Sequence, residues 1–283
     1  MKKRHLFSAG VTVGPTILWM ILFVVIPLLY VIAISLMEKA TYGGTSAAFS
    51  VQGYKDAATV NNLKIFGDSL LLSVETTVIC LLVGYPFGWV IARSDSKLKP
   101  LLVVLLMLPF WVNSIIRLYG WNILLSNEGV LNHFLMSIGI IQKPLTIMYT
   151  DGAVLLGMVY DLLPFTVLPI YTSIEKLDPS LVEAARDLGA TGSRAFRRVI
   201  LPQTMPGVFA GTVQTFIPSL GLFYISEMMG GGTSYYIGNL IKDQFFSGRN
   251  WPAGAALSIV LILITLFLMR FYTKAGGNLE DMA

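Results

Sequence analysis

The sequence predicts an all-α membrane protein with about six transmembrane helices. Two observations predict this fold class. Of the 283 residues, 55% are hydrophobic and only 13% are charged, whereas charged residues make up about 25% of a typical soluble domain. The apolar residues also form runs of about 20 or more, the length that an α-helix needs to cross a bilayer with all its backbone hydrogen bonds internal. One soluble core cannot bury so much apolar surface.

The first predicted span lies in the uncharged run from Val11 to Met37. The basic residues Lys2, Lys3 and Arg4 precede it. A cleaved signal peptide has an apolar core of about 7 to 15 residues, and this run is longer. We therefore expect the first helix to stay in the protein as an uncleaved signal anchor.

Five further apolar segments have the length of a transmembrane helix. They are predicted at residues 69–92, 100–125, 152–174, 203–229 and 251–272. Prolines recur inside the six spans, and each one removes a backbone donor and bends its helix. These prolines indicate either ordinary packing or broken helices that line a path. They are Pro27, Pro86, Pro109, Pro164, Pro169, Pro206 and Pro218.

The distribution of Lys and Arg between the spans predicts the topology. One set of alternate connections, which includes both tails, carries thirteen of these residues, and the other set carries six. Cytoplasmic segments retain Lys and Arg during insertion, so both termini are expected in the cytoplasm. The longer connections, residues 38–68, 126–151 and 230–250, then face outward. Nothing in the apolar pattern marks a second domain, so residues 1–283 are predicted to form a single transmembrane domain.

The connection at residues 177–206 is predicted to be a helix, a turn and a second helix on the cytoplasmic side. Asp178 is expected to cap the first helix, with Pro179 at its first position. Gly189 supplies the left-handed residue that ends it. Thr191 or Ser193 is the expected cap of the second helix, which should break before Pro202.

The first of these helices is expected to be amphipathic. One side carries small and apolar residues and the other side carries charges. The apolar side comprises Leu181, Ala184, Ala185 and Leu188, and the charged side comprises Glu183, Arg186 and Asp187.

This loop resembles the EAA loop of permeases in the ATP-binding cassette family, whose pattern is E-A-A, three residues, G, nine residues, I, one residue and L-P. Val199 replaces the isoleucine of the pattern. The resemblance implies a coupling helix that docks into a groove on the ATPase subunit and carries its closing motion into the membrane. An ordinary amphipathic connector is the alternative. The matching residues, expected to couple to the ATPase, are Glu183, Ala184, Ala185, Gly189, Leu201 and Pro202.

The wider chain resembles B-type permease subunits of bacterial spermidine/putrescine importers. Residues 108–121, 171–190 and 221–256 carry this resemblance. It implies a type I importer permease (MetI-like) architecture in a bacterial inner membrane and a polyamine substrate. It also implies three kinds of partner protein: two copies of an ATPase, a second and different permease, and a periplasmic substrate-binding protein.

The sequence offers no site for ATP hydrolysis. A phosphate-binding loop needs G-x-x-x-x-G-K-S/T, and the glycine cluster at residues 230–232 lacks the lysine. We therefore expect a permease that is not an enzyme, with no cofactor of its own and with ATP bound by the partner ATPase. His5 and His133 stand alone, so no metal site is expected. Basic residues lie between apolar spans, which argues against nucleic acid and for contact with membrane lipid.

Ionisable residues inside the spans indicate a substrate pathway, because such groups usually face a bundle interior or a water-filled path. Glu75, Asp161 and Glu227 outnumber the single base Arg117, which suits a cationic substrate. If Arg117 pairs with one of the acids, this charge argument weakens. The aromatic residues expected to line the pathway through stacking or cation–π contacts are Trp111, Tyr160 and Tyr224, although aromatic residues also form belts at membrane interfaces.

Alternatives to polyamine import remain at this point. Related permeases that carry another solute, such as a metal-carrying complex or an oxyanion, share the EAA loop. A secondary transporter or a membrane receptor subunit would need no ATPase. An intramembrane enzyme fits least, because no nucleophile and base lie at a recognisable spacing. The sequence does not distinguish spermidine from putrescine.

Overall fold

The computed structural model describes residues 13–274. These residues form two compact units. The first unit comprises residues 13–63 together with Leu240–Ile264, and the second comprises Lys64–Asn239 together with residues 265–274. The prediction of a single domain over the whole chain stays a prediction.

The first unit begins with an apolar helix over Val13–Ser35. Within it, the π-turn η1 (Ile21–Val25) leads into α2 (Ile26–Ser35), and the N–H of Ile26 bonds to the carbonyl of Ile21. The next residue, Pro27, has no N–H to donate, so the wider turn accommodates it within one helix.

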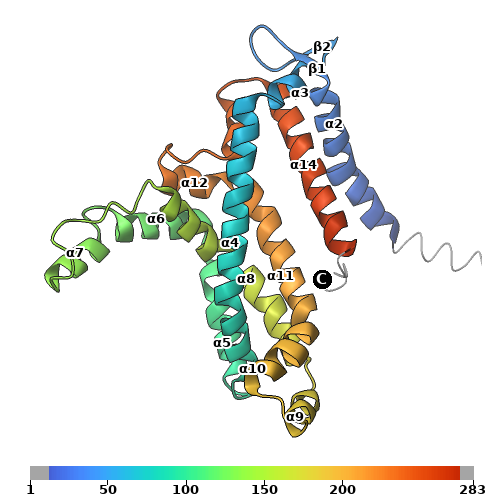
Figure 1. Cartoon of the computed structure of the whole chain (residues 1–283). Coiled ribbons are helices and arrows are strands. Elements are labelled where there is room, and N and C mark those ends of the chain that lie inside the picture. The colour runs from blue at the N-terminus through green and yellow to red at the C-terminus, as the bar shows by residue number, and fades with distance from the viewer. Residues whose placement is uncertain (1–12, 275–283) are drawn as a thin grey trace, which may run out of the picture. The chain divides into compact units, whose positions relative to one another are not determined.

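A small β-hairpin follows α2, in a connection for which the sequence predicted no regular structure. Strand β1 (Met37–Lys39) pairs with β2 (Thr45–Phe49) in antiparallel register, and α3 (Gln52–Ala57) comes next. The predicted all-α fold class is confirmed, and this short hairpin is a local addition to it. The hairpin was missed because its strands are short and lack clear alternation. Figure 1 labels these elements.

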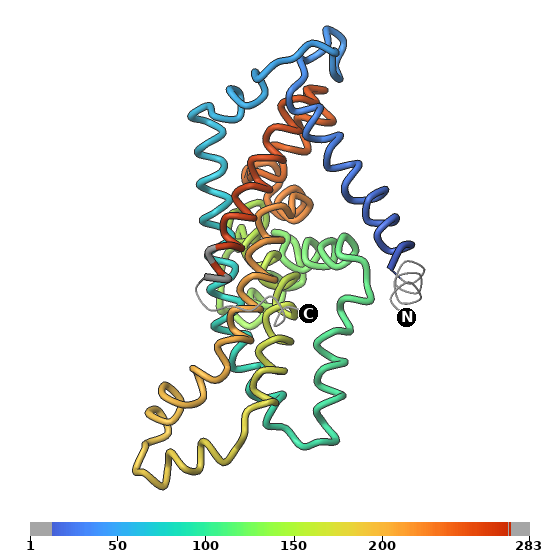
Figure 2. The backbone as a smooth tube through the Cα atoms, turned by 90° about the vertical axis from the view of Figure 1, so that its right-hand side faces the viewer, coloured from blue at the N-terminus to red at the C-terminus, as the bar shows by residue number. Residues whose placement is uncertain are grey.

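Three helices form the centre of the second unit: α4 (Val60–Arg93), α8 (Asp151–Glu175) and α11 (Leu201–Gly221). The buried side of α4 is made mainly of small and hydroxyl-bearing residues, and its exposed side between Asp68 and Arg93 is apolar apart from Glu75. This is the pattern of a membrane helix, because small residues allow close approach of helices and apolar ones meet lipid. Figures 1 and 2 show these helices running together.

Glycines set the close contacts among these three helices. A Cβ atom at Gly88 of α4 would lie 3.0 Å from Ile170 Cγ2 of α8. A Cβ atom at Gly207 of α11 would collide with the carbonyl oxygen of Pro169 and lie 2.5 Å from Ser173 Cβ. Between the same two helices, the hydroxyls of Thr166 and Thr215 hydrogen-bond at 2.6 Å.

We expect Gly207→Ala to destabilise the protein, because neither backbone can yield without separating α8 from α11. Overpacking of this kind costs about 1–3 kcal/mol. Thermal melting of the purified protein checks the prediction. Gly67→Ala on α4 is the matched control, since a Cβ there meets nothing within 4 Å. Equal melting temperatures for the Gly207 variant and the wild type would contradict the close contact.

Two predicted spans, at residues 100–125 and 203–229, are broken rather than straight. The first runs through α5 (Lys99–Met107) and the 3₁₀ turn η2 (Leu108–Trp111), then bends by 91° into α6 (Ser114–Leu125). The second bends by 64° between α11 and α12 (Phe223–Gly230).

Each break follows a proline, Pro109 in the first case and Pro218 in the second. The broken-helix interpretation of the prolines therefore holds at these two positions. Pro86, Pro164, Pro169 and Pro206 instead lie inside helices that continue through them.

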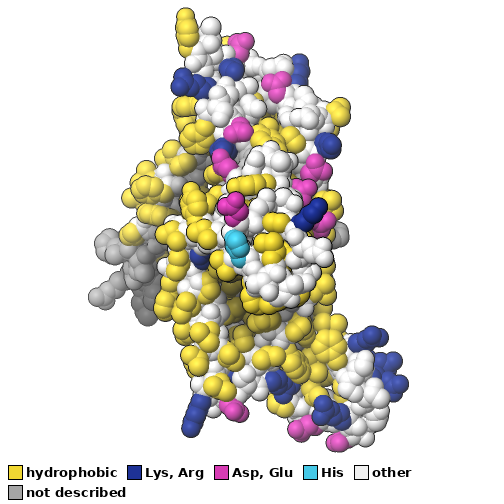
Figure 3. All heavy atoms as spheres, turned by 90° about the vertical axis from the view of Figure 1, so that its left-hand side faces the viewer, with side chains coloured by type: hydrophobic (Ala, Val, Ile, Leu, Met, Phe, Trp, Pro, Cys, Tyr) yellow, Lys and Arg dark blue, Asp and Glu magenta, His cyan; other side chains and the backbone are white. Residues whose placement is uncertain are grey.

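Among the described residues, four helices are long and apolar enough to cross a membrane, or six if each bent pair forms one span. The fourth is α14 (Trp251–Lys274). The remaining helices are α7 (Val130–Ser137) and α13 (Ile237–Phe246), with α9 (Pro179–Asp187) and α10 (Gly192–Ala195) at one end of the second unit. Figure 3 shows hydrophobic side chains over the middle of this unit and Lys, Arg, Asp and Glu around α9.

Candidate functional site

The first half of the loop at residues 177–206 folds locally as its sequence predicts. The side chain of Asp178 accepts a hydrogen bond from the backbone N–H of Ser180 at 2.9 Å and so caps α9, with Pro179 at the first position. This bond and a second from the Ser180 hydroxyl hold the pKa of Asp178 below its ordinary value. Gly189, with φ of +79°, ends the helix. The cap and the stop are confirmed.

The second helix of the loop differs from the prediction. Thr191 is its N-cap residue, but no side-chain capping bond forms. The helix also does not break before Pro202, because α10 continues through the π-turn η3 (Phe196–Ile200) into α11. The N–H of Leu201 bonds to the carbonyl of Phe196, and this wider turn absorbs the missing donor of Pro202.

The apolar side predicted for α9 is largely exposed, although Leu181 also lines a hollow with residues of α8 and α11. Val182 is the buried residue of α9 and packs with Leu177 and Ile200. Leu181 and Leu188 are instead 44% and 90% exposed. The apolar stripe therefore remains accessible, which suits contact with another polypeptide better than contact with the chain's own helices.

The six residues predicted to couple to an ATPase occupy two neighbouring places. Glu183, Ala184 and Ala185 lie on α9, with Glu183 and Ala184 exposed, and Gly189 follows in the turn. Leu201 and Pro202 form the first turn of α11, which is continuous with η3, against which α9 packs. The motif thus connects the exposed short helix α9 to the first turn of the long helix α11.

A buried charge cluster lies within the helices of the second unit. Arg117 of α6 and Asp161 of α8 form an ion pair with 2.6 Å between Nη2 and Oδ1, and their side chains are 6% and 8% exposed. The hydroxyl of Tyr224, on α12, donates to Asp161 Oδ2 at 2.8 Å. Ser114 contacts both partners, 2.7 Å from Arg117 Nη2 and 3.3 Å from Asp161 Oδ1. We call these residues, with Phe110 and Tyr160, the Arg117 cluster.

Two aromatic rings enclose the guanidinium of the Arg117 cluster. Its central carbon lies 4.9 Å from the ring centre of Phe110 and 5.4 Å from that of Tyr160. Tyr160 in turn makes an edge-on contact with Trp121 at 5.3 Å. A cation held by a carboxylate and aromatic faces in a desolvated place gains both Coulomb and cation–π attraction.

The structure therefore brings together three of the predicted pathway residues, Asp161, Tyr160 and Tyr224. It places the other three elsewhere: Glu75 on the exposed side of α4, Glu227 on the exposed side of α12, and Trp111 at the helix break, 78% exposed. Because Arg117 neutralises Asp161, the excess negative charge of the spans rests on Glu75 and Glu227. The charge argument for a cationic substrate is weakened accordingly.

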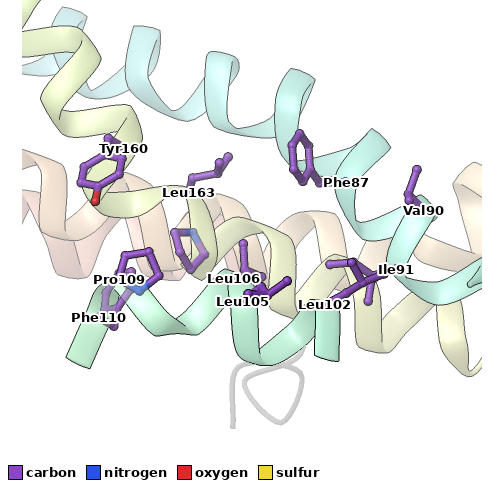
Figure 4. A pocket seen from close by; sticks show the side chains of 11 residues that line it. Phe87, Val90, Ile91, Leu102, Leu105, Leu106, Pro109, Phe110, Tyr160 and Leu163 are labelled. Carbon is purple, nitrogen blue, oxygen red and sulfur yellow. The ribbon is translucent and has the colours of Figure 1, made fainter. Parts of the chain in front are cut away.

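Two cavities flank Tyr160 along α8. One, of about 360 Å³, lies between α4, α5 and α8, with Tyr160 and Phe110 at one end and Val90 and Leu102 at the other (Figure 4). The second, of about 410 Å³, is lined by the first half of α8 and by Trp121. Tyr160 borders both cavities, so the Arg117 cluster stands between a hollow toward each end of α8.

Sequence reasoning missed Ser114 and Phe110 as members of the Arg117 cluster. One signal was available: Ser114 lies one helical turn before Arg117, and Phe110 directly follows a proline. The break that directs Phe110 and Arg117 toward the same place is a tertiary feature, so spacing alone does not predict their contact.

Comparisons with known proteins agree with this architecture. A family model described as binding-protein-dependent transport system inner membrane component matches residues 84–275. The spermidine/putrescine transport system permease protein PotB of Salmonella typhimurium is 43% identical over 280 residues, which cover 99% of this chain and 97% of the relative. PotB of Escherichia coli is 44% identical over 262 residues, which cover 93% of this chain and 95% of the relative.

A solved structure shares the fold at low sequence identity. It is a bacterial ABC transporter involved in the import of the acidic polysaccharide alginate, with a TM-score of 0.75, 18% identity and coverage of 98% of both chains. At this identity the likeness concerns the fold alone. The family match and the near-full-length relatives show that the chain belongs to the binding-protein-dependent inner membrane transport components, the multi-pass permease subunits of ATP-binding cassette importers.

Proposed function

We propose that this chain is one permease subunit of an ATP-driven importer for polyamines, spermidine or putrescine, in a bacterial inner membrane. The observation that carries the proposal is the 43% identity, over 99% of the chain, to permeases named for spermidine/putrescine transport. The similarity extends over nearly the whole of both chains, so a shared solute class is the simplest inference.

The loop at residues 177–206 transmits the closing motion of the ATPase subunits, which are separate polypeptides, to the membrane helices. A periplasmic binding protein delivers the solute to the outward connections, two ATPase copies close on ATP, and the exposed α9 moves with the groove in which it sits. Glu183, Ala184 and Ala185 contact that groove, and Gly189 allows the sharp turn behind them. Leu201 and Pro202, in the first turn of α11, transmit this motion to α11 and the helices packed against it.

This chain and its partner subunits have different roles in the importer. ATP is bound and hydrolysed by the partner, and this chain binds no cofactor or metal. Residues 1–283 act as a single permease domain with both termini cytoplasmic, surrounded by lipid. A second, different permease supplies the other half of the path.

The solute passes along a route to which six residues of this chain contribute. The exposed acids attract the cation, and the Arg117 cluster meets it within the membrane. Aromatic faces contact its ammonium groups and alkyl segments. The six residues are Glu75, Asp161, Glu227, Trp111, Tyr160 and Tyr224.

Purification of the importer with its partner subunits, followed by ATPase measurement in liposomes, tests this function. Solute-loaded binding protein is expected to raise ATP hydrolysis when the solute is spermidine or putrescine and not when it is molybdate. Stimulation by another solute alone would make the chain an importer permease for that solute. Uptake that needs no ATP would instead indicate a secondary transporter.

A further inference from the structure

The Arg117 cluster contains the groups with which proteins recognise an organic cation. Nη2 of Arg117 lies 2.6 Å from a carboxylate oxygen of Asp161 and 2.7 Å from the hydroxyl of Ser114. The rings of Phe110 and Tyr160 flank the same guanidinium. A carboxylate combined with aromatic faces is an arrangement that binds ammonium ligands. In this structure the guanidinium of Arg117 occupies the position between the carboxylate and the two rings.

Arg117 fills the site incompletely. A guanidinium carries five N–H donors, and strong Arg–carboxylate pairs commonly use two of them in a parallel fork. Arg117 reaches both Asp161 and Ser114 through Nη2 alone. Its Nε and Nη1 atoms are buried without a hydrogen-bond partner, on a side chain that is 6% exposed. A pair kept only for stability would be expected to satisfy these donors.

The Arg117 cluster also borders two hollows along α8, both through Tyr160. Tyr160, one wall of the cluster, borders the cavity of about 360 Å³ toward the Glu175 end of α8. It also borders the cavity of about 410 Å³ toward the Asp151 end. The ring of Tyr160 therefore separates both hollows from the guanidinium of Arg117, which lies 5.4 Å from the centre of that ring.

The partners of Asp161 come from segments that begin directly after helix breaks. Asp161 lies on α8, which is packed tightly against α4 and α11. Arg117 lies one turn into α6, directly after the 91° bend. Tyr224 lies in the first turn of α12, directly after the 64° bend. Rotation at the break before α6 would carry Arg117 away from Asp161 and leave α8 in place. The helix α12 packs closely on α8, since a Cβ atom at Gly157 of α8 would lie 2.9 Å from Ile225 Cγ2.

We infer that Arg117 is an internal stand-in for the transported cation. It neutralises Asp161 while the path is empty, and a primary ammonium group of the polyamine replaces it there during transport. An ammonium is a compact charge with three donors, which suit the carboxylate, the Ser114 hydroxyl and a ring face. Because one cation replaces another, the buried carboxylate is never left without a counter-charge. This inference rests on the proposed function.

Equilibrium binding of radiolabelled spermidine to the purified importer complex, without its binding protein, tests the inference. Removing the stand-in should open the site, so Arg117→Gln and Arg117→Met are each expected to bind spermidine at least tenfold more tightly than the wild type. The double variant Arg117→Gln/Asp161→Asn should lose this gain. Lys97→Gln, which removes one exposed charge in the turn between α4 and α5, is the matched control and should bind as the wild type does.

The two neutral variants guard against a folding failure, because glutamine still offers donors to Asp161 and Ser114. Binding no tighter than wild type in the variant that assembles would overturn the inference, and so would an equal gain in Lys97→Gln. Spermidine uptake is measured with the same wild-type complex after it is placed in liposomes and supplied with its binding protein and ATP. Its absence would contradict the proposed function, whereas uptake without the gain in binding would contradict only the role of Arg117.

Discussion

Replacing Gly189 with valine is expected to abolish both solute uptake and the stimulation of ATP hydrolysis by the loaded binding protein. Gly189 adopts φ of +79°, a conformation that costs a β-branched residue about 1–3 kcal/mol. A Cβ atom there would meet nothing within 4 Å, so the effect acts on the turn and not on packing. The turn sets the direction of α9, and a misdirected α9 no longer fits its groove. Uptake assays and ATPase assays on the same liposomes measure both losses.

Two other glycines provide matched controls. Gly192→Ala lies three residues further along the loop, in open space and without a positive φ, and should leave uptake unchanged. Gly139→Val imposes the same backbone strain, at φ of +75°, in a connection expected to face outward. Membrane insertion of all three variants should equal that of the wild type. Normal uptake by Gly189→Val would contradict the coupling role of the loop.

Asp161→Asn is expected to reduce uptake at least tenfold, a change of about 1.4 kcal/mol in the barrier. The substitution keeps the shape of the side chain but removes the charge that faces Arg117. Leaving a buried charge without its partner costs about 3–5 kcal/mol, so Arg117 must move or the helices around it must loosen. In either case the cation meets no carboxylate in the Arg117 cluster. Initial rates of spermidine uptake measure the effect.

Asp95→Asn serves as the control for loss of a carboxylate. Asp95 is exposed in the turn between α4 and α5, away from the Arg117 cluster. Its substitution should leave the uptake rate at the wild-type value. If Asp161→Asn transported spermidine as fast as Asp95→Asn, the pathway role of Asp161 would be rejected.

The helices that could be predicted from sequence are those whose ends are set by local chemistry. Residues 152–174 and 251–272 were expected as spans, and α8 and α14 occupy Asp151–Glu175 and Trp251–Lys274. The start of α4 at Val60 was missed because its first turns are polar and extend beyond the apolar run. The bends after Pro109 and Pro218 were not fixed either, because a membrane proline bends, breaks or leaves its helix straight according to its neighbours.

The same division applies to the candidate site. The cap at Asp178 and the stop at Gly189 depend on residues a few positions apart, so capping rules predicted them. The Arg117 cluster depends on contacts between residues 44 and 63 positions apart in the chain. The sequence offers three acids within the spans, Glu75, Asp161 and Glu227, as partners for Arg117, and it does not select among them. Only the packing of α6 and α12 on α8 selects Asp161.

Cross-linking from α9 tests the central claim, that the loop at residues 177–206 transmits the motion of the ATPase subunits to the membrane helices. Ala184 is exposed, and Cys80 is the one cysteine of the sequence, so Ala184→Cys in a Cys80→Ser background gives a single reactive thiol. The account predicts a cross-link from this thiol to the ATPase subunit in the intact importer, with a yield that changes when ATP is bound. Labelling of the thiol by a membrane-impermeant reagent from the periplasmic side, with no cross-link to the ATPase, would contradict it.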